Sequence, residues 1–387
     1  MGALTLTGLI PTIYDAMDVV SRELVGFIPA VSRDSSAVRA AVDQVVRSPV
    51  VGVMAAENVQ VGATSADTPA QTIGSVDMTI SKARCVAFGV TGEETLGLGG
   101  NLATINRDRI AQALRTLTNE VEADLAALHI HASRAYGTFN LTPFGTAGDL
   151  TDFANPRQIL DDNGAPQSDM HMVLGSSAVA NIRGKMSTLF KLNESGDDRL
   201  LRFGELGQVD GFALHNSGQV KRAVTAGTGA SATTNTAGYA VGATVITLAS
   251  AGTGTVLAGD IITFAGDSNK YVVAVGDADV SNGGSITIAE PGLRQAIPAA
   301  ATNITVIAAT TRNMFFHRSA IQLATRAPAM PEGGDSADDV MMVTDPVSGL
   351  TYEFCIYRQK RQVRYEVNLA WGVKMVAPRH AGILIGA

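Results

Sequence analysis

The stretch TINRDRIAQALRTLTNEVEADLAALHIHASRA, from Thr104 to Ala135, decides the fold of this chain. Its apolar residues recur at intervals of three and four: Ile110, Leu114, Leu117, Val121, Leu125, Leu128 and Ala132. This spacing places them on one face of a single α-helix. Asn101 or Thr104 can cap the start of the helix, and Gly137 ends it. At 1.5 Å per residue, about 32 residues give a rod of roughly 45 Å, which is long for a compact domain.

The composition favours a protein with large interfaces. The chain has 387 residues, of which 46% are hydrophobic and 17% are charged, against about 25% charged residues in an ordinary soluble domain. This length predicts two or three domains. A soluble protein with so little charge must cover part of its surface, and contacts between subunits would do so. The net charge of −7 argues against a dedicated nucleic-acid binder, which usually has a basic domain.

Several classes of protein are disfavoured by what the sequence lacks. The two cysteines, Cys85 and Cys355, are too few to form a zinc site and indicate a reducing compartment. The first residues have no basic region followed by an apolar run, so we expect no signal peptide. No run of 18 apolar residues occurs, so we expect no transmembrane helix and no membrane partner.

No motif for catalysis is recognisable. The segment Gly175–Val179 lacks the second glycine of a nucleophile elbow, and Ser176 fits better as a helix cap. The segment Gly97–Leu102 has leucine where a dinucleotide loop needs its third glycine. We therefore expect a protein that is not an enzyme and that has no cofactor or metal.

The first 49 residues resemble an arm rather than a domain. Two short amphipathic helices are predicted there, over residues 11–24 and 35–46. Isolated helices of this length are marginal in water. We therefore expect the arm to be stable only when it lies on another surface.

Residues 50–92 have a strand-like pattern instead of a helical one, and they predict a long two-stranded excursion away from the body of the protein. Residues 50–54 are strand-like, and residues 76–81 alternate between apolar and polar side chains. Between them, residues 62–72 form a turn-rich polar tip. A two-stranded excursion is poorly stable alone, so this one too is expected to lie on something else.

Two further units are predicted after the two-stranded excursion. Residues 93–148 carry the long helix, and residues 149–217 have the mixed pattern of an α/β unit, with helices at 151–160 and 176–186. Its strands are predicted at 171–174 and 209–215.

Residues 218–310 are rich in glycine, alanine, threonine and valine and show no helical period. Short strands separated by turn residues are predicted over 244–248, 259–265, 270–275, 285–289 and 303–307. This regular alternation of short strands and turns indicates a small β-barrel or sandwich. Because strands and mixed patterns resume in residues 311–387, the segment is predicted to be an inserted domain. A strand pair or strand–helix piece is expected over 313–324, a hairpin from 352–357 and 362–371, and closing strands over 373–378 and 382–385.

The order of these parts resembles the major capsid proteins of tailed bacteriophages, which have the Hong Kong 97-type fold. Residues 1–49 resemble the N-arm of that fold, 50–92 its E-loop and 104–135 its spine helix, within a peripheral domain that begins at residue 93. Residues 172–182 and 203–216 resemble its axial domain. The final stretch, residues 362–381, is the most similar piece.

The inserted segment indicates which subfamily of these capsid proteins the chain resembles. Residues 252–266 are similar to the insertion domain of coat proteins from short-tailed phages, and residues 313–321 resemble the strand that returns from it. The fold class that the resemblance implies is α+β: N-arm, E-loop, peripheral domain, axial domain and an inserted small β domain.

The resemblance implies that this chain forms pentamers and hexamers, which close into an icosahedral shell. The implied partners are a separate scaffolding protein, a portal and double-stranded DNA packaged without sequence specificity, and a decoration protein is left open. The implied location is the virion capsid, assembled in the cytoplasm of a bacterial host. Negative charge suits a wall to which DNA should not adhere.

Two sets of residues are candidates for contacts. By analogy with the family and by exposure, Asp15, Asp18, Arg22 and Glu23 on the arm are candidates for binding the scaffold, but their pattern favours a solvated helix face.

The second set is basic: Arg358, Lys360, Arg361 and Arg364. On one continuous strand, all but Arg361 would share a face. They would contact either DNA phosphates or carboxylates of a neighbouring subunit, and the acidic chain favours the carboxylates.

Two other classes of protein stay open. An encapsulin-like bacterial compartment shell shares the fold but encloses cargo enzymes, and the inserted β segment favours a phage protein instead. A surface adhesin would account for the segment rich in glycine, threonine and alanine, but the missing signal peptide argues against it.

Overall fold

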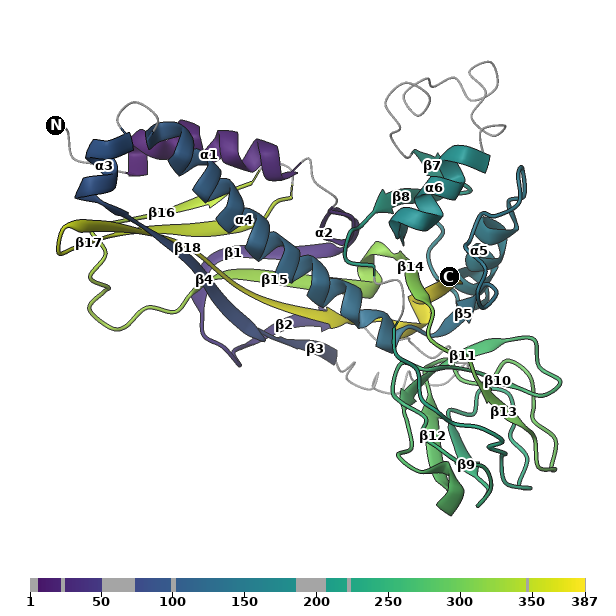
Figure 1. Cartoon of the computed structure of the whole chain (residues 1–387). Coiled ribbons are helices and arrows are strands. Elements are labelled where there is room, and N and C mark those ends of the chain that lie inside the picture. Colours follow the sequence, from purple (N-terminus) through teal and green to yellow (C-terminus); the bar gives the residue numbers. More distant parts are fainter. Residues whose placement is uncertain are drawn as a thin grey trace, which may run out of the picture.

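The computed structural model describes residues 6–21, 25–50, 74–98, 102–185, 207–220, 224–345 and 348–386. The molecule is elongated. A long sheet with helices on one face forms one end, and a compact second sheet with a β-rich segment forms the other (Figure 1). The α+β class is confirmed.

The long sheet has six strands. Its order is β1-β15-β18-β17-β16, and β4 also pairs with β18. The strands are β1 (Ser32–Ala40), β4 (Lys82–Thr91), β15 (Ile321–Pro328), β16 (Asp339–Thr344), β17 (Thr351–Gln359) and β18 (Gln362–Met375). The expected hairpin is confirmed as β17 and β18. However, β18 continues to Met375, because its second half pairs with β15 after its first half has paired with β4 and β17.

The long helix is α4 (Leu102–Ala127), which lies across one face of this sheet with α1 (Leu6–Ser21) beside it (Figure 1). Its apolar stripe is buried against β17 and β18. Polar contacts add to this packing: the Asp124 carboxylate accepts hydrogen bonds from Lys82 Nζ at 2.7 Å and from Trp371 Nε1 at 2.9 Å.

The predicted extent of the long helix is wrong at its end. The α-helix gives way to a 3-10 turn, η2 (Leu128–His131), and then to β5 (Arg134–Tyr136). The chain leaves the helix because Ser133 and the residues after it bond to β19 (Ala381–Gly386) instead. Ala132 and Ala135 pack in a separate apolar cluster with Ile383 and Ile385.

The helix expected over residues 35–46 is also wrong. Residues 32–40 form β1, which pairs in parallel with β15, and residues 45–50 form β2 (Val45–Val50). Pairing with a neighbouring strand outweighs a weak local helical pattern. The earlier helix does form, as α1, but residues 22–24 lie outside the described residues. The short helix α2 (Phe27–Ala30) follows them.

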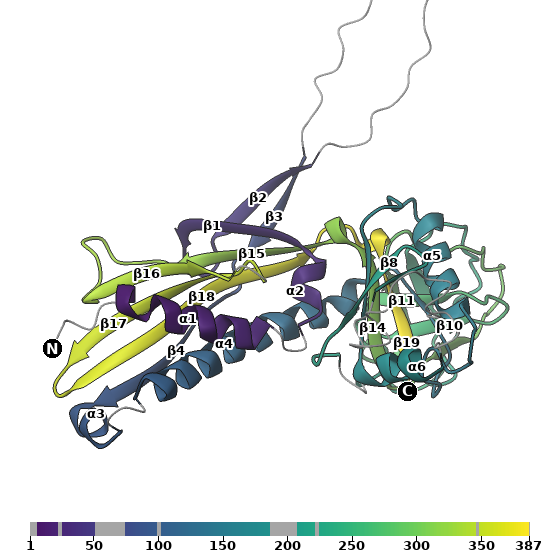
Figure 2. The same ribbon diagram turned by 90° about the horizontal axis from the view of Figure 1, so that it is seen from above.

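The strands β2 and β3 (Gly74–Thr79) form a separate two-stranded ribbon. Figure 2 shows the ribbon leaving the side of the long sheet. Met78 and Ile80, at its base, pack against Ala40, Ala324 and Ala370. The strand expected over 50–54 and the polar tip lie outside the described residues, except for residue 50. The short helix α3 (Gly92–Leu98) follows β4.

The compact end is built on a second sheet, whose order is β13-β10-β11-β5-β19-β14-β6-β8-β7. Its central strands and helices are β6 (Met170–Leu174), β7 (Gln208–Val209), β8 (Phe212–Asn216), β14 (Thr311–His317), α5 (Thr151–Asp162) and α6 (Ser176–Lys185). The single strand expected over 209–215 is instead a hairpin. Asp210 and Gly211 turn the chain between β7 and β8 with φ of 49° and 83°.

The β-rich segment contains the five expected strands, within two residues at each end. They are β9 (Val245–Leu248), β10 (Ile261–Phe264), β11 (Lys270–Val275), β12 (Gly284–Ile288) and β13 (Ile304–Val306). These strands enclose an apolar cluster of their own, centred on Ile246, Ile262 and Val273. The segment is also joined to the compact end, because β11 pairs with β5. The domain boundaries stay a prediction.

Candidate assembly surfaces

A buried carboxylate anchors the arm to the long helix. Glu122 of α4 accepts hydrogen bonds from the backbone nitrogens of Gly26 at 2.6 Å, Phe27 at 2.7 Å and Ile28 at 3.1 Å. The Ser217 hydroxyl donates a fourth, at 2.8 Å. Burial raises the pKa of Glu122, and the four hydrogen bonds oppose that shift. The contact fixes where the chain passes from the arm into the long sheet.

No pattern in the sequence predicts this role for Glu122. Glutamate in a long helix is usually exposed, and Glu122 lies beside the apolar stripe rather than within it. Its donors come from segments about 95 residues away in both directions along the chain. No pattern within one segment could therefore have identified it.

The candidate residues for scaffold binding are only partly described. Ile13 and Met17 on α1 are buried against α4, and Asp15 is exposed on the opposite side of the helix. Asp18 belongs to α1, but its side chain lies outside the described residues, as do Arg22 and Glu23 entirely. Exposure of Asp15 is compatible with both a partner contact and a solvated face.

The basic candidates do not share one face, and this part of the prediction is wrong. The chain reverses at Lys360 and Arg361, and cross-strand partners in the resulting hairpin share a face. Arg358 pairs with Val363, whereas Arg364 pairs with Tyr357. Arg358 and Arg364 therefore lie on opposite faces of the sheet.

Two of these basic residues form ion pairs with carboxylates of the described chain. Arg358 Nε lies 3.0 Å from an Asp338 carboxylate oxygen, and Arg364 lies 2.7 Å from Glu366. Lys360 and Arg361 are exposed at the turn and have no carboxylate partner among the described residues. They border a shallow hollow of about 710 Å³ between the hairpin and the start of α3.

Apolar side chains are exposed on the arm, on the link to the ribbon and on α3. Val38 on β1 is 66% exposed, Val42 is 47% exposed, and Val45 on β2 is 44% exposed. Leu96 on α3 is 87% exposed. These side chains accompany a strand at the sheet edge and a two-stranded ribbon, both of which can pair with or lie on another chain.

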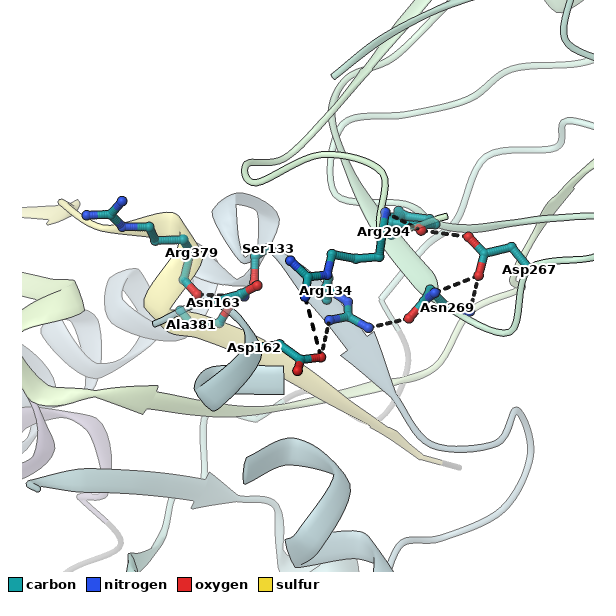
Figure 3. A network of polar contacts seen from close by, with 10 residues as sticks. Ser133, Arg134, Asp162, Asn163, Asp267, Asn269, Arg294, Arg379 and Ala381 are labelled. Atoms are coloured by element: carbon teal, nitrogen blue, oxygen red, sulfur yellow. Dashed lines mark hydrogen bonds and ion pairs between the residues drawn. The ribbon is translucent and has the colours of Figure 1, made fainter. Parts of the chain in front are cut away.

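A polar network joins the β-rich segment to the compact end (Figure 3). The Asp162 carboxylate of α5 lies 3.5 Å from Arg134 Nη1 and 3.8 Å from Arg294 Nη2. Arg134 also donates to Asn269, which donates in turn to Asp267 at 2.6 Å. Burial lowers the pKa of Arg134. The network therefore holds a buried guanidinium between α5 and the loop after β10.

On the other side of Figure 3, Asn163 Nδ2 donates to the backbone oxygen of Arg379 at 2.8 Å and to Ser133 Oγ at 3.3 Å. Ser133 Oγ donates to the backbone oxygen of Ala381 at 2.7 Å. These bonds hold the start of β19 against the end of α5.

Within the described ranges, no cluster of three or more histidine, cysteine, aspartate or glutamate side chains could hold a metal ion. No helix in the described part of the chain is long and apolar enough to span a membrane.

The sequence matches no protein-family model and no curated protein. Among solved structures, the capsid of the cyanophage P-SCSP1u is 11% identical over 95% of this chain and 89% of that chain, with a TM-score of 0.48. A structure from Mycobacterium phage Che8 is 15% identical over 88% and 84%, with a TM-score of 0.43. The capsid of a native GTA particle is 10% identical over 95% and 91%, with a TM-score of 0.44.

Proposed function

We propose that this chain is a major capsid protein of the Hong Kong 97 type, which assembles with copies of itself into the icosahedral head of a tailed phage. The observation that carries the proposal is that the arm and the ribbon have strand edges without a partner in the described chain. β1 is an edge strand that carries the exposed Val38, and β2 and β3 pair only with each other in the described chain. An isolated two-stranded ribbon is at best marginally stable in water, so a neighbouring subunit would supply the missing surface.

The implied partners follow from the same proposal. A scaffolding protein would contact the arm around Asp15, a portal would occupy one vertex, and double-stranded DNA would fill the shell. The protein would be part of the virion after assembly in the host cytoplasm, and it would act as a structural protein rather than an enzyme. A decoration protein on the outer surface stays open.

The β-rich segment has a role of its own in this proposal. Its separate apolar cluster gives the segment a core of its own, and the Arg134 network and the pairing of β11 with β5 join it to the compact end. We infer that it mainly aids folding and stabilises the subunit or its pentamer and hexamer. If deletion of residues 220–309 left the yield and the stability of the shell unchanged, this role would be excluded.

Negative-stain electron microscopy tests the main proposal. The full chain would be expressed alone and together with the phage genes that neighbour its own. Closed shells of uniform size, or irregular spirals without the scaffold, are expected. A monomer that persists in both conditions would contradict the proposal and favour the adhesin. Shells that form without a scaffold and enclose protein cargo instead of DNA would favour the encapsulin-like alternative.

A further inference from the structure

A buried arginine lies where the long helix meets the second sheet. Arg312 is the second residue of β14 and pairs with Ile385 of β19. Successive side chains of a strand alternate between the two faces, so Arg312 shares its face with Met314 and Phe316. Those two pack in the apolar cluster around α4. Arg312 itself is only 4% exposed, so its guanidinium lies on the inner face of the sheet.

Among the residues that the structure describes, none accepts a hydrogen bond from this guanidinium. Its Nε, Nη1 and Nη2 atoms all lack a hydrogen-bond partner in the described chain. Asp260 is the nearby carboxylate that acts on its charge, but that carboxylate accepts from the backbone nitrogens of Gly227 at 3.1 Å and Leu257 at 2.7 Å. Burial lowers the pKa of Arg312 to about 10, so the side chain is still charged at neutral pH.

The other two buried arginines of the described chain each have a carboxylate partner. Arg134 is 7% exposed and lies 3.5 Å from Asp162. Arg326 is 8% exposed and lies 2.9 Å from Asp34. The fold thus supplies a carboxylate within salt-bridge distance for each of them but not for Arg312, although Arg312 is the most deeply buried of the three.

A cavity of about 310 Å³ adjoins Arg312. Ala123, Ala126 and Ala127 from the last turns of α4 form one wall, and Val220 and Val224 form another. Three further polar residues line it: His129, Gln219 and Thr225. The cavity therefore combines small apolar walls with one guanidinium and a few other polar groups, as sites for small ligands often do.

Burial of the charge needs compensation. The effective penalty for burying one unpaired ion is several kcal/mol. The carbonyl end of α4 lies beside the cavity and favours a cation, but a helix terminus offsets only a small part of this penalty. The part of the penalty that the helix end does not offset favours an anion as the missing partner. The planar guanidinium of an arginine can form two parallel hydrogen bonds with a carboxylate or a phosphate.

We propose that this cavity binds a small oxyanion, either inorganic phosphate or the carboxylate of a small organic acid, through the guanidinium of Arg312. The oxyanion would occupy the space beside α4 and would tie the start of β14 to the helix end and to the segment that leads into the β-rich strands. The site lies within one subunit, so the proposal does not depend on assembly into a shell.

Equilibrium dialysis of the full-length chain tests the proposal and separates the two sources. Radiolabelled phosphate and radiolabelled succinate would be used in parallel, at constant ionic strength set with chloride. We expect one equivalent of at least one of the two to bind per chain. Arg312→Met replaces the guanidinium by an apolar side chain and should weaken this binding at least tenfold. Ala123→Leu keeps the charge and fills the cavity, and it should weaken binding to a similar degree.

The outcomes are distinguishable even if one variant fails to fold. Arg312→Lys keeps the charge without the planar fork and should bind more weakly than the original chain. The proposal would be overturned if the original chain bound neither ion, or if binding survived both the loss of the guanidinium and the filling of the cavity. In that case Arg312 is compensated by water and by the helix end alone.

Discussion

A carboxylate oxygen of Glu122 lies 2.7 Å from the backbone nitrogen of Phe27, in a contact that spans 95 residues of sequence. The two residues belong to the long helix and to the end of the arm. Phe27 is fully buried and stacks on Phe316 of β14, with ring centroids 6.3 Å apart. The helix, the arm and the second sheet therefore meet at one point. Glu122 accepts the hydrogen bonds of the backbone N–H groups that are buried where they meet.

Truncation of Glu122 should destabilise the subunit. Glu122→Ala leaves four buried donors without an acceptor, and we expect it to lower the free energy of unfolding by about 3 kcal/mol. Glu122→Gln keeps one oxygen and should cost about 1 kcal/mol. Urea denaturation of the unassembled subunit would measure both effects, and hydrogen exchange at Gly26, Phe27 and Ile28 should become faster.

The matched control is Glu120→Ala, two residues earlier on the same helix. Glu120 is partly exposed and lies 3.4 Å from the exposed Arg84. Exposed ion pairs contribute at most about 1 kcal/mol, so this variant should be close to the original in stability. Equal losses for Glu120→Ala and Glu122→Ala would contradict the anchoring role.

The effect of Glu122 should also depend on pH. Burial raises its pKa above the ordinary value of 4.5, so the folded chain holds this proton more tightly than the unfolded chain. Between the two pKa values the folded state binds more protons, and stability falls as pH rises. The stability that the protonated Glu122 carboxyl contributes is complete below pH 4.5 and is lost as pH rises above the raised pKa of the folded chain. The stability difference between the original chain and Glu122→Gln should therefore shrink as pH rises through this window; a difference that grew would contradict the shift.

The sequence was informative wherever a single segment determined its own structure. The apolar stripe of α4 lies within 25 residues, and each strand of the β-rich segment is bounded by its own turn residues. The five strands of the β-rich segment and the start of α4 lie within two residues of their predicted positions, whereas α4 ends at Ala127 because the residues after it pair with β19. The pattern from 35 to 46 failed because its structure depends on β15, which lies almost 300 residues later in the chain.

The same distinction explains the candidate contacts. The basic residues were easy to find as a cluster, but their faces depend on where the hairpin turns, and the turn at Lys360 and Arg361 reverses the alternation. Arg312 gave no signal in the sequence. Its importance comes from the absence of a partner, which only the packed structure can reveal.

The network around Asp162 should control how firmly the β-rich segment is held. Asp162→Asn removes the carboxylate near Arg134 and Arg294, and it leaves the buried Arg134 with Asn269 alone. We expect a loss of about 1–2 kcal/mol in the free energy of unfolding. Hydrogen exchange should be faster at Lys270 and Tyr271, which pair with β5.

The neighbouring carboxylate provides a control for this prediction. Asp161 is partly exposed and lies 4.0 Å from Arg157, one turn earlier on α5. Asp161→Asn should leave exchange in β11 unchanged. If both variants accelerated exchange there equally, the effect would come from α5 as a whole rather than from the contact with Arg134.

The exposed turn of the β17–β18 hairpin should act in assembly rather than in folding. Lys360→Gln combined with Arg361→Asn removes both charges, and asparagine tolerates the φ of 58° at Arg361. We expect unchanged unfolding of the subunit and slower formation of shells, because these cations would pair with carboxylates of a neighbouring acidic subunit. Light scattering and electron microscopy would measure assembly. Arg358→Gln, whose charge is already paired with Asp338, should have the smaller effect. Normal shells that fail to retain DNA would instead assign the turn to the packaged genome.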